Sequence, residues 1–453
     1  MPLLLPQLPA FVVALFLTTL SMVSAEHFAV LVCGSHTYGN YRHHADVAHA
    51  YHVAVSGGIK KQNIIVMMYD DVVNDIENPF PGQLFNKPTP AGTPGIDVYH
   101  GVPKDYTGNA VTAVNFLAVL TGNKTAMKNI GSGRVLESTS TDRVFINFVD
   151  HGGVGLIAFP NQPYLYKKDL HNALIQMYNT SMYKELVFYL EACESGSMFQ
   201  DFPTDKNVYI TTAANAKESS WGTYCAPHDL INGTNLNTCL GDLYSVNWLE
   251  NSETSNTKKE TLNEQYTKVK KLTNKSHVMQ FGDIATIGAE PVADFIGNDD
   301  PTRHASNATV PASVSTTSEV GHFDSRDHEL NRFFYAYART EDPREADRLI
   351  QEIKSRVTHR SNIEQIAMLV THGSVEETAR LMDVNTYSIP IHDACHKQVN
   401  MAYAEYCGGF TDYSLKFVRV IVNMCEQKIV EGETTMEERI QHMVQAVATV
   451  CGG

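Results

Sequence analysis

The fold is decided by two stretches of sequence, VFINFVDHGG at residues 144–153 and LVFYLEACESG at residues 186–196. Each begins with a short apolar run without alternation, which is typical of a strand buried on both faces of a parallel sheet. Active sites of open α/β sheets lie beyond the carboxyl ends of such strands. Two adjacent strands would therefore bring His151 and Cys193 together. We predict a catalytic dyad, in which the imidazole takes the thiol proton and the thiolate attacks a carbonyl carbon.

The glycines at 152 and 153 leave room for a substrate, and their backbone N–H groups could stabilise an oxyanion. Each half of the dyad also has an ordinary interpretation. A strand followed by His-Gly is common in α/β proteins, and a cysteine at a strand end is usually a small buried hydrophobe. The flanking motifs must therefore decide between the two interpretations.

The region around the dyad alternates strands with helices, as in a parallel sheet with crossover helices. Strands are predicted at 28–32, 64–68 and 208–212, and helices at 45–55, 112–120 and 168–178. The segment 78–95 contains five prolines, which exclude a regular helix or a central strand. It is predicted to be a surface loop, either an element of the cleft rim or a neutral insertion.

The carboxyl-terminal third has a different pattern. Periodic hydrophobicity is lost over 288–323, which is rich in Asp, Ser, Thr, Ala and Pro and is predicted to be a linker. Helical spacing then predicts helices at 327–339, 343–357, 363–370, 375–382, 394–406, 413–425 and 434–450. The predicted organisation is 1–25 signal peptide, 26–287 α/β domain, 288–323 linker and 324–453 helical domain. Taken alone, the last domain could be a partner-binding module.

Composition limits the function. The 453 residues are 43% hydrophobic and 19% charged, which describes a globular protein with a sizeable core. A net charge of -15 argues against nonspecific nucleic-acid binding. Neither a His-Glu-X-X-His metal motif nor a glycine-rich phosphate loop is present, so no metal and no cofactor are predicted.

The amino terminus predicts the compartment. Residues 3–23 are largely apolar and Val-Ser-Ala at 23–25 suits a signal peptidase, so we expect cleavage after Ala25; an uncleaved anchor is the alternative. No later segment approaches the ~20 apolar residues that span a bilayer. Secretory passage also fits five glycosylation sequons, of which we expect some to be used: Asn123, Asn179, Asn232, Asn274 and Asn307.

Eight cysteines are present, and Cys33 is predicted to be a buried structural thiol. Apart from Cys33 and Cys193, the other six can pair in an oxidising compartment. The last four of these allow three connectivities, which the sequence alone does not separate.

The motifs around the dyad identify a family. EACESGSM at 191–198, together with DHG at 150–152, resembles the legumain family of asparaginyl endopeptidases. The resemblance continues through NYRH at 40–43, VMMYDD at 66–71, GVPKDYTG at 101–108, TTAAN at 211–215 and GDLYSVNW at 241–248. It implies a caspase-like α/β domain and a cysteine endopeptidase that cleaves after Asn, and after Asp at acidic pH. It also implies that the helical domain is an inhibitory prodomain of an acid-activated zymogen.

By this resemblance, Arg42 binds the carbonyl oxygen of the substrate Asn, and Glu191 and Asp242 accept hydrogen bonds from its NH₂ group. His43 and Ser220 complete the wall of the pocket. An Asn side chain needs such a pairing of donor and acceptors. The alternative for Arg42 and Asp242 is an internal ion pair that braces two loops.

The resemblance also makes Asn40 the group that orients the His151 ring, and it assigns the oxyanion N–H groups to Gly152 and Cys193. The alternative for Asn40 is a turn or helix cap. Val149 stands where familiar members carry a small polar residue, so we predict no role for the neighbouring Asp150.

The resemblance implies the disulfides Cys225–Cys239, Cys395–Cys425 and Cys407–Cys451. Basic residues of the prodomain are candidates for contacts with the acidic catalytic face: Arg344, Arg348, Lys354 and Arg356. Autocleavage is predicted after Asn298, with Asn307 as the second candidate. The implied partners are proteins and peptides with accessible Asn, the chain's own prodomain and cystatin-type inhibitors, and the implied location is a lysosome, a vacuole or the exterior.

Three other functions share part of this pattern. A peptide ligase would use every residue named so far, because an amine can replace water in resolving the acyl-enzyme. The catalytic subunit of the glycosylphosphatidylinositol transamidase is similar around the dyad, but it is expected to carry a carboxyl-terminal membrane span, which 441–453 are too short and polar to form. A catalytically inactive binding or storage protein is the third alternative.

Overall fold

The computed structural model describes residues 25–297, 321–383, 387, 390–427 and 435–452. The predicted signal peptide, apart from Ala25, and both predicted autocleavage residues, Asn298 and Asn307, lie outside these described residues.

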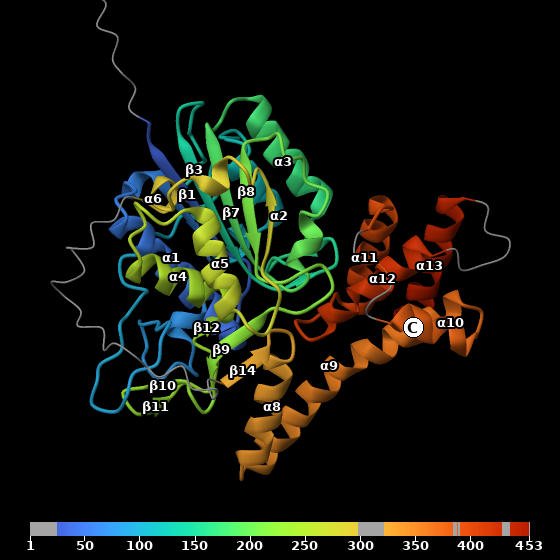
Figure 1. Cartoon of the computed structure of the whole chain (residues 1–453). Helices are drawn as coiled ribbons and strands as arrows, with labels where there is room; N and C mark the ends of the chain where they lie inside the picture. The colour runs from blue at the N-terminus through green and yellow to red at the C-terminus, as the bar shows by residue number, and fades with distance from the viewer. Residues whose placement is uncertain (1–24, 298–320, 384–386, 388–389, 428–434, 453) are drawn as a thin grey trace, which may run out of the picture.

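A six-stranded sheet forms the centre of the α/β unit (Figure 1). Its order is β13-β8-β7-β3-β1-β2, and all neighbours are parallel except the edge strand β13. The bounds are β1 His27–Cys33, β2 Ile64–Met67, β3 Arg143–Val149, β7 Glu185–Glu191, β8 Val208–Thr212 and β13 Met279–Gly282. The predicted mostly parallel sheet is thus confirmed.

Helices cover both faces of this sheet and bury two separate cores. On one side, residues of α1 (Tyr41–Ser56), α4 (Leu243–Thr254) and α5 (Leu262–Leu272) form a cluster in which Trp248 lies edge-on to Phe145 and Tyr189. On the other side, α2 (Ala113–Leu120) and α3 (Lys167–Asn179) pack against the opposite faces of the same strands. Strands buried on both faces explain why their sequences are apolar without alternation.

Small strands extend the edge at which the long strands end. They are β4 Gly152–Gly153, β5 Leu156–Ile157, β6 Leu165–Tyr166, β9 Trp221–Cys225, β10 Leu230–Ile231, β11 Thr234–Asn235, β12 Gly241–Asp242 and β14 Gly321–Asp324. Short 3₁₀ turns are η1 Tyr38–Asn40, η2 Lys61–Asn63, η3 Val72–Asn74, η4 Gly108–Ala110, η5 Ser195–Met198, η6 Ile287–Ala289 and η7 Ser414–Phe417.

The segment 78–95 forms neither helix nor strand, as its prolines predict. It is nevertheless not wholly a surface insertion. Leu84, Phe85 and Asn86 are buried, and the Thr89 N–H donates to the Leu230 carbonyl of the β10–β11 hairpin at 2.9 Å.

The predicted linker begins too early and ends too late. Helix α6 (Ala293–Ile296) buries Phe295 and Ile296 in the core of the α/β unit, so this packed unit continues to the end of the helix. At the other end, β14 pairs antiparallel with β9. Both elements are too short to show a periodic pattern in the sequence. Packing in the core stabilises α6, and pairing with β9 stabilises β14.

The helical unit follows β14. Its helices are α8 His328–Arg339, α9 Pro343–Val370, α10 Val375–Met382, α11 Asp393–Cys407, α12 Val418–Glu426 and α13 Met436–Cys451. The two helices predicted at 343–357 and 363–370 are one helix, because the intervening THRSN contains neither Pro nor Gly and continues the turn. The helix predicted from 413 starts at Val418, after η7.

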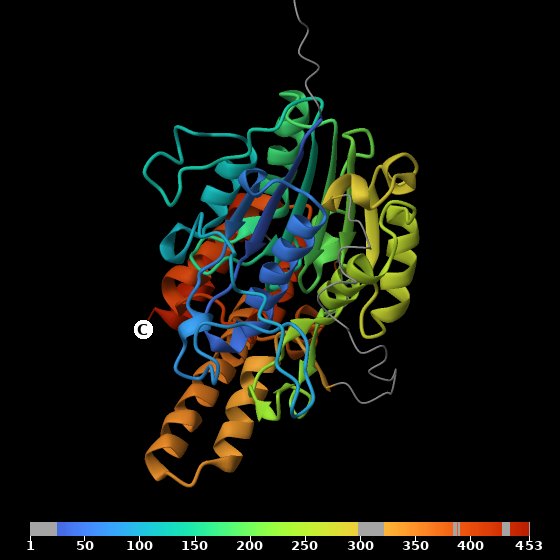
Figure 2. The same ribbon diagram turned by 90° about the vertical axis from the view of Figure 1, so that its left-hand side faces the viewer.

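The helical unit projects from the strand ends of the sheet. Figures 1 and 2 show α8 and α9 running side by side as a hairpin that points away from the sheet, with α10 to α13 clustered at the far end of α9. Helices α9, α11, α12 and α13 share a core that includes Ile366, Val399, Ile421 and Met443.

Three disulfides join the pairs that the resemblance implied, Cys225–Cys239, Cys395–Cys425 and Cys407–Cys451. Cys33 and Cys193 are free and buried. Four predicted glycosylation residues, Asn123, Asn179, Asn232 and Asn274, are exposed. Within the described ranges, we find no helix with the length and apolar character that crossing a bilayer requires.

The disulfide between α11 and α12 gives a test of the helical unit. Replacing Cys395→Ser together with Cys425→Ser opens a loop of 30 residues, and we expect the free energy of unfolding of this unit to fall by about 3 to 4 kcal/mol. Urea unfolding of the full chain, followed by circular dichroism, measures the change. Cys225→Ser with Cys239→Ser is the control and should leave the helical transition in place. An unchanged helical transition in the first variant would contradict this expectation.

Candidate active site

His151 and Cys193 follow the ends of two neighbouring strands, as the sequence predicts. Strands β3 and β7 pair with Val149 opposite Glu191, and the Asp150 N–H donates to the Glu191 carbonyl at 3.0 Å. Gly152 lies directly against the Cys193 backbone, because a Cβ at position 152 would be 2.4 Å from the Cys193 carbonyl oxygen. Any larger residue would push His151 and Cys193 apart.

The His151 ring is held at one nitrogen and open at the other. Its Nε2 lies 2.8 Å from the Asn40 side-chain oxygen, so Nε2–H donates to this amide. Nδ1 is buried, with no hydrogen-bond partner in the described part of the chain. Asn40 is the residue before the first turn of α1, yet its side chain does not cap that helix.

Cys193 is fully buried in this state. The Ser220 N–H points at its Sγ at 3.3 Å. Burial raises the pKa of the Cys193 thiol to about 12, although the Arg326 guanidinium opposes the shift. The sulfur is therefore a neutral thiol at physiological pH, and it is not a competent nucleophile while covered.

The predicted pocket residues come together behind Cys193. Arg42 and His43 lie in the first turn of α1, not on a loop, and both are buried. Arg42 Nε donates to Asp242 Oδ1 at 2.9 Å, and His43 Nε2 lies 3.5 Å from Asp242 Oδ2. Glu191 accepts hydrogen bonds from the Ser245 N–H and hydroxyl, each at 2.9 Å. Arg42 and Asp242 form an ion pair, and this pair is part of a larger charged wall.

Charge is concentrated in this wall. Burial raises the pKa of Glu191 well above its usual value, and the charge of Asp242 adds to the shift. Burial and the Arg42 charge lower the pKa of His43, so its ring is neutral. Glu191 Oε1 and Asp242 Oδ2 are buried and accept no hydrogen bond from the described residues. Two acceptors and one guanidinium are thus available to a polar group.

The chain itself fills this pocket with Ser325, a residue that the sequence pattern did not reveal. Strand β14 lies antiparallel on β9, with Asp324 opposite Trp221, and leads into Ser325. The Ser325 N–H donates to the Ser220 carbonyl at 3.0 Å, and Arg42 Nη2 donates to the Ser325 carbonyl at 3.2 Å. The Ser325 hydroxyl donates to Asp242 Oδ1 at 3.2 Å. A main-chain strand with a polar side chain thus occupies the site beside the thiol.

A second segment of the helical unit reaches His151. The Asp412 carboxylate, located before η7, accepts from Asn40 Nδ2 at 2.8 Å and lies 3.4 Å from His151 Nε2. Burial alone would lower the pKa of His151, but the Asp412 charge raises it overall. The His151 charge holds the pKa of Asp412 well below its usual value against the effect of burial. No local sequence signal distinguished Asp412 from a turn residue.

The four basic residues predicted to contact the catalytic face do not do so. Arg348 and Arg356 pair with glutamates of α8 and α9, and Arg344 and Lys354 form no ion pair with any described residue. Helix α9 carries them away from the protease, where i, i+3 and i, i+4 partners are closer. Besides His151–Asp412, the ion pairs between the two units among the described residues are Arg326–Glu194, Arg332–Glu77 and Lys397–Asp169.

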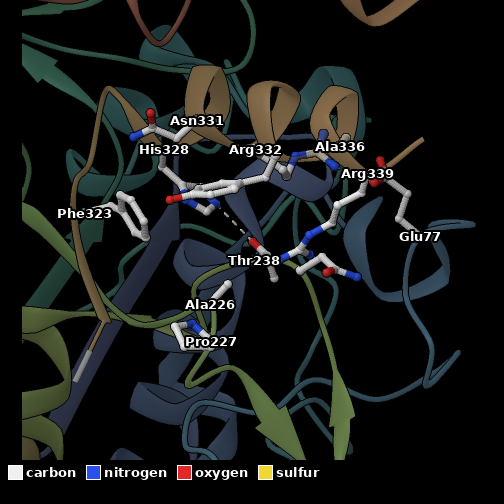
Figure 3. Close-up of a pocket in the computed structure, with 12 residues that line it drawn as sticks. Glu77, Ala226, Pro227, Thr238, Phe323, His328, Asn331, Arg332, Ala336 and Arg339 are labelled. Atoms are coloured by element: carbon white, nitrogen blue, oxygen red, sulfur yellow. Dashed lines mark hydrogen bonds and ion pairs between the residues drawn. The ribbon is translucent and has the colours of Figure 1, made fainter. Parts of the chain in front are cut away.

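A cavity of about 510 Å³ lies between α8 and the protease loops at 226–238 (Figure 3). Figure 3 shows His328 of α8 reaching toward Thr238, with Phe323 at one side and Arg332 and Arg339 at the other. Neither Cys193 nor His151 lines it. Because α8 forms one wall, the cavity exists in this form only while the helical unit is docked.

His43, Asp150 and His151 place potential metal-ligand atoms within 4.8 Å of one another. Two of these side chains already have close hydrogen-bond partners, since His43 Nδ1 lies 2.7 Å from the Ser35 hydroxyl and His151 Nε2 faces Asn40. Burial raises the pKa of Asp150 to about 7 against the effect of His151. We assign no metal to this cluster.

Comparisons with known proteins agree with these groupings. A model of the Peptidase C13 family matches residues 27–298, and a model of the legumain prodomain matches residues 347–451. A vacuolar-processing enzyme of Phaseolus vulgaris is 41% identical over 446 residues, covering 94% of this chain and 85% of the relative. A legumain of Canavalia ensiformis is 39% identical over 442 residues, covering 94% of this chain and 88% of the relative.

A crystal structure of caspase-1 from Spodoptera frugiperda aligns with 61% of this chain and 91% of its own, at 8% identity and a TM-score of 0.35. The family match itself covers more than half of the chain, and the two relatives extend it over nearly the whole length. This chain therefore belongs to the Peptidase C13 family of cysteine peptidases and carries a legumain prodomain.

Proposed function

We propose that the protein is an endopeptidase that cleaves after Asn, and after Asp at acidic pH, and that it is made as an acid-activated zymogen. The observation that carries this proposal is the position of Ser325 in the pocket. Its carbonyl and hydroxyl lie between Arg42 and Asp242, beside the Cys193 thiol, at the end of a strand paired as a bound peptide would be.

An Asn side chain fits the groups that Ser325 leaves partly unsatisfied. Arg42 Nη2 would donate to the amide oxygen, and the unpartnered oxygens Glu191 Oε1 and Asp242 Oδ2 would accept from its NH₂ group. His43 and Ser220 close the remaining sides. An ionised Asp would meet repulsion from the two carboxylates, whereas a protonated Asp presents a donor to them. Cleavage after Asp should therefore increase as pH falls toward a carboxyl pKa near ~4.

Catalysis follows from the dyad. His151 accepts the Cys193 proton, and the thiolate attacks the carbonyl carbon on the C-terminal side of the Asn. The Gly152 and Cys193 N–H groups donate to the resulting oxyanion. The C–N bond breaks as His151 returns the proton to the leaving nitrogen, which produces an amine and a thioester. Water then attacks the thioester carbonyl carbon and loses a proton to His151. The C–S bond breaks, the product leaves as a carboxylic acid, and His151 returns the proton to the Cys193 sulfur. Asn40 would orient the ring throughout.

Latency is explained by three contacts of the prodomain. Ser325 fills the pocket, Arg326 pairs with Glu194 beside the nucleophile, and Asp412 pairs with His151. In this docked state Cys193 is buried, and burial raises the pKa of its thiol although the Arg326 guanidinium opposes the shift. Removal of the prodomain would expose Cys193 and open the pocket to proteins or peptides with accessible Asn. Cystatin-type inhibitors would compete for the same cleft.

The remaining alternatives differ in the fate of the thioester and in location. An incoming amine would resolve the same intermediate, so ligase activity is a second candidate for this site. The legumain prodomain match favours a legumain over the transamidase subunit. Because relatives bear the name vacuolar-processing enzyme, we propose a vacuole or lysosome reached through the secretory pathway.

Peptide turnover tests the function directly. Matched peptides with Asn, Asp or Gln before the scissile bond are incubated with acid-activated enzyme from acidic to neutral pH, with and without an added amine. We expect turnover after Asn over the whole pH range and turnover after Asp only at low pH. We expect no turnover after Gln at any pH in the range. Cys193→Ala should remove all turnover, since the thioester cannot form. Equal turnover of Asn and Gln peptides would contradict the pocket, and ligated product would add the transpeptidase activity.

Replacing Asp412→Asn tests the contact with the catalytic histidine. The depressed pKa of Asp412 stabilises the docked state above the usual carboxyl pKa of 3.8, and this stabilisation is lost as pH falls through the lower, docked value. The raised pKa of His151 stabilises docking below 6.5, and this stabilisation is lost as pH rises through the raised value. The pair is therefore strongest in weakly acidic solution, where we expect the variant to activate about tenfold faster.

The control for this variant is Asp169→Asn, which removes an exposed ion pair across the same interface. Exposed pairs contribute little to stability, so activation of the control should stay near the wild-type rate. Activation is followed by gel electrophoresis and by turnover at pH values near 5. Equal acceleration in both variants would show that Asp412 acts as an ordinary surface charge.

Autocleavage after Asn298 is tested by replacing Asn298→Gln and following processing at acidic pH. The longer side chain should not fit the pocket, so we expect loss of the cut at this position. Asn307→Gln serves as the matched control. Unchanged processing in the Asn298 variant would contradict autocleavage after Asn298 and favour autocleavage after Asn307.

A further inference from the structure

We propose that Asp46, held by Asn86 of the segment 78–95, is a positioning residue that fixes Asp242 in the specificity pocket. The inference rests on the proposed function, because it takes Asp242 as a group that contacts the substrate amide. Neither Asp46 nor Asn86 touches the thiol or the catalytic histidine in any described contact. Their role is in the geometry of the pocket wall.

One helix holds both the side chain and the backbone of Asp242. Arg42 Nε donates to Asp242 Oδ1 at 2.9 Å, and one turn later on α1 the Asp46 carboxylate accepts the Asp242 N–H at 3.1 Å. Residues at i and i+4 lie on the same helix face, so the two contacts reach Asp242 from one side. All three side chains are buried. Water therefore does not replace either contact if it is lost.

Asn86 fixes the Asp46 carboxylate in turn. Its Nδ2 donates to Asp46 Oδ1 at 2.7 Å and to the Leu240 carbonyl at 2.9 Å. A carbonyl oxygen can only accept, so the NH₂ group of Asn86 must face this side. A Cβ at Gly241 would lie 2.8 Å from Asn86 Nδ2 and 3.0 Å from Asp46 Oδ1. The pair thus packs directly on the backbone that leads into Asp242.

The network continues from Asn86 to the protein surface. Asn86 Oδ1 lies 2.8 Å from His49 Nδ1, and His49 Nε2 lies 2.8 Å from Glu253 Oε1. Both partners are acceptors, so both ring nitrogens must carry hydrogen and the imidazole is cationic. Burial would lower the pKa of His49, but the hydrogen bond to Glu253 contributes to an overall increase. A continuous hydrogen-bonded path therefore runs from α4 through the 78–95 segment to the pocket.

An alternative is that Asn86 merely stabilises its own loop. Asn78 provides a matched control for that alternative. It is buried in the same segment, and its Nδ2 donates to the Val73 and Gln83 carbonyls at 2.9 and 3.1 Å. Its side-chain amide donates to neither Asp46 nor Asp242 in the part of the chain that the structure describes. Loss of either amide should weaken the loop, but only loss of Asn86 should release Asp46.

The experiment compares Asn86→Ala with Asn78→Ala after acid activation. For Asn peptides, we expect Asn86→Ala to raise KM about tenfold and to leave kcat within about twofold, since the buried hydrogen bonds serve binding and not the reacting atoms. Asn78→Ala should leave KM unchanged. Alkylation of Cys193 by iodoacetamide should proceed at the wild-type rate in both. Equal changes in both variants, or a fall in kcat alone, would overturn the proposal.

Hydrogen exchange of the full-length zymogen separates this proposal from the proposed function. Amides at 240–245 should exchange faster in Asn86→Ala and not in Asn78→Ala. If the wild type showed no Asn-selective turnover while this difference appeared, the proposed function would fail and the positioning role would stand. Unchanged exchange in Asn86→Ala would overturn the positioning role whatever the substrate.

Discussion

The parallel pairing of β3 with β7 is the contact on which the site depends. It places Val149 opposite Glu191, so that His151 and Cys193 each lie two positions beyond this pair, at one edge of the sheet. The same register makes Glu191 both the last residue of β7 and a wall of the pocket. A slip of one residue would reverse the faces of Glu191 and its neighbours and separate the nucleophile from the specificity groups.

Buried charge is the second constraint. Arg42 faces Asp242, with Glu191 and Asp46 nearby, and none of these groups is exposed. Such a cluster is unfavourable unless each charge is paired or each carboxyl protonated, which is why backbone N–H groups, Ser245 and Asn86 surround it. The prodomain uses the same logic. It brings a carboxylate to His151 and a guanidinium to Glu194, so the proposed latency and the proposed specificity would depend on neighbouring buried groups.

Much of the fold and of the candidate site could be predicted from the sequence, because short local patterns of residues indicate them. Apolar runs indicated the strands, and the residues after them indicated the dyad; the motifs suggested the pocket and the disulfides. The contacts that were missed join distant segments. Asn40 and Asp412 are 372 residues apart, and nothing near Asp412 marks it as a partner of the catalytic histidine. Strand β14 and helix α6 are too short to show a periodic pattern in the sequence. On α9, Arg348 and Arg356 form ion pairs with glutamates that lie nearer than the predicted catalytic face.

A crystal structure of the acid-activated enzyme with a peptide aldehyde ending in Asn tests the central claim most directly. The account predicts a covalent bond from the Cys193 sulfur to the aldehyde carbon, with the inhibitor main chain on β9 in the place of β14. The Asn amide oxygen should lie within hydrogen-bond distance of Arg42, and its nitrogen within that distance of Glu191 and Asp242. An inhibitor bound to Cys193 with its Asn side chain outside this pocket would contradict the account.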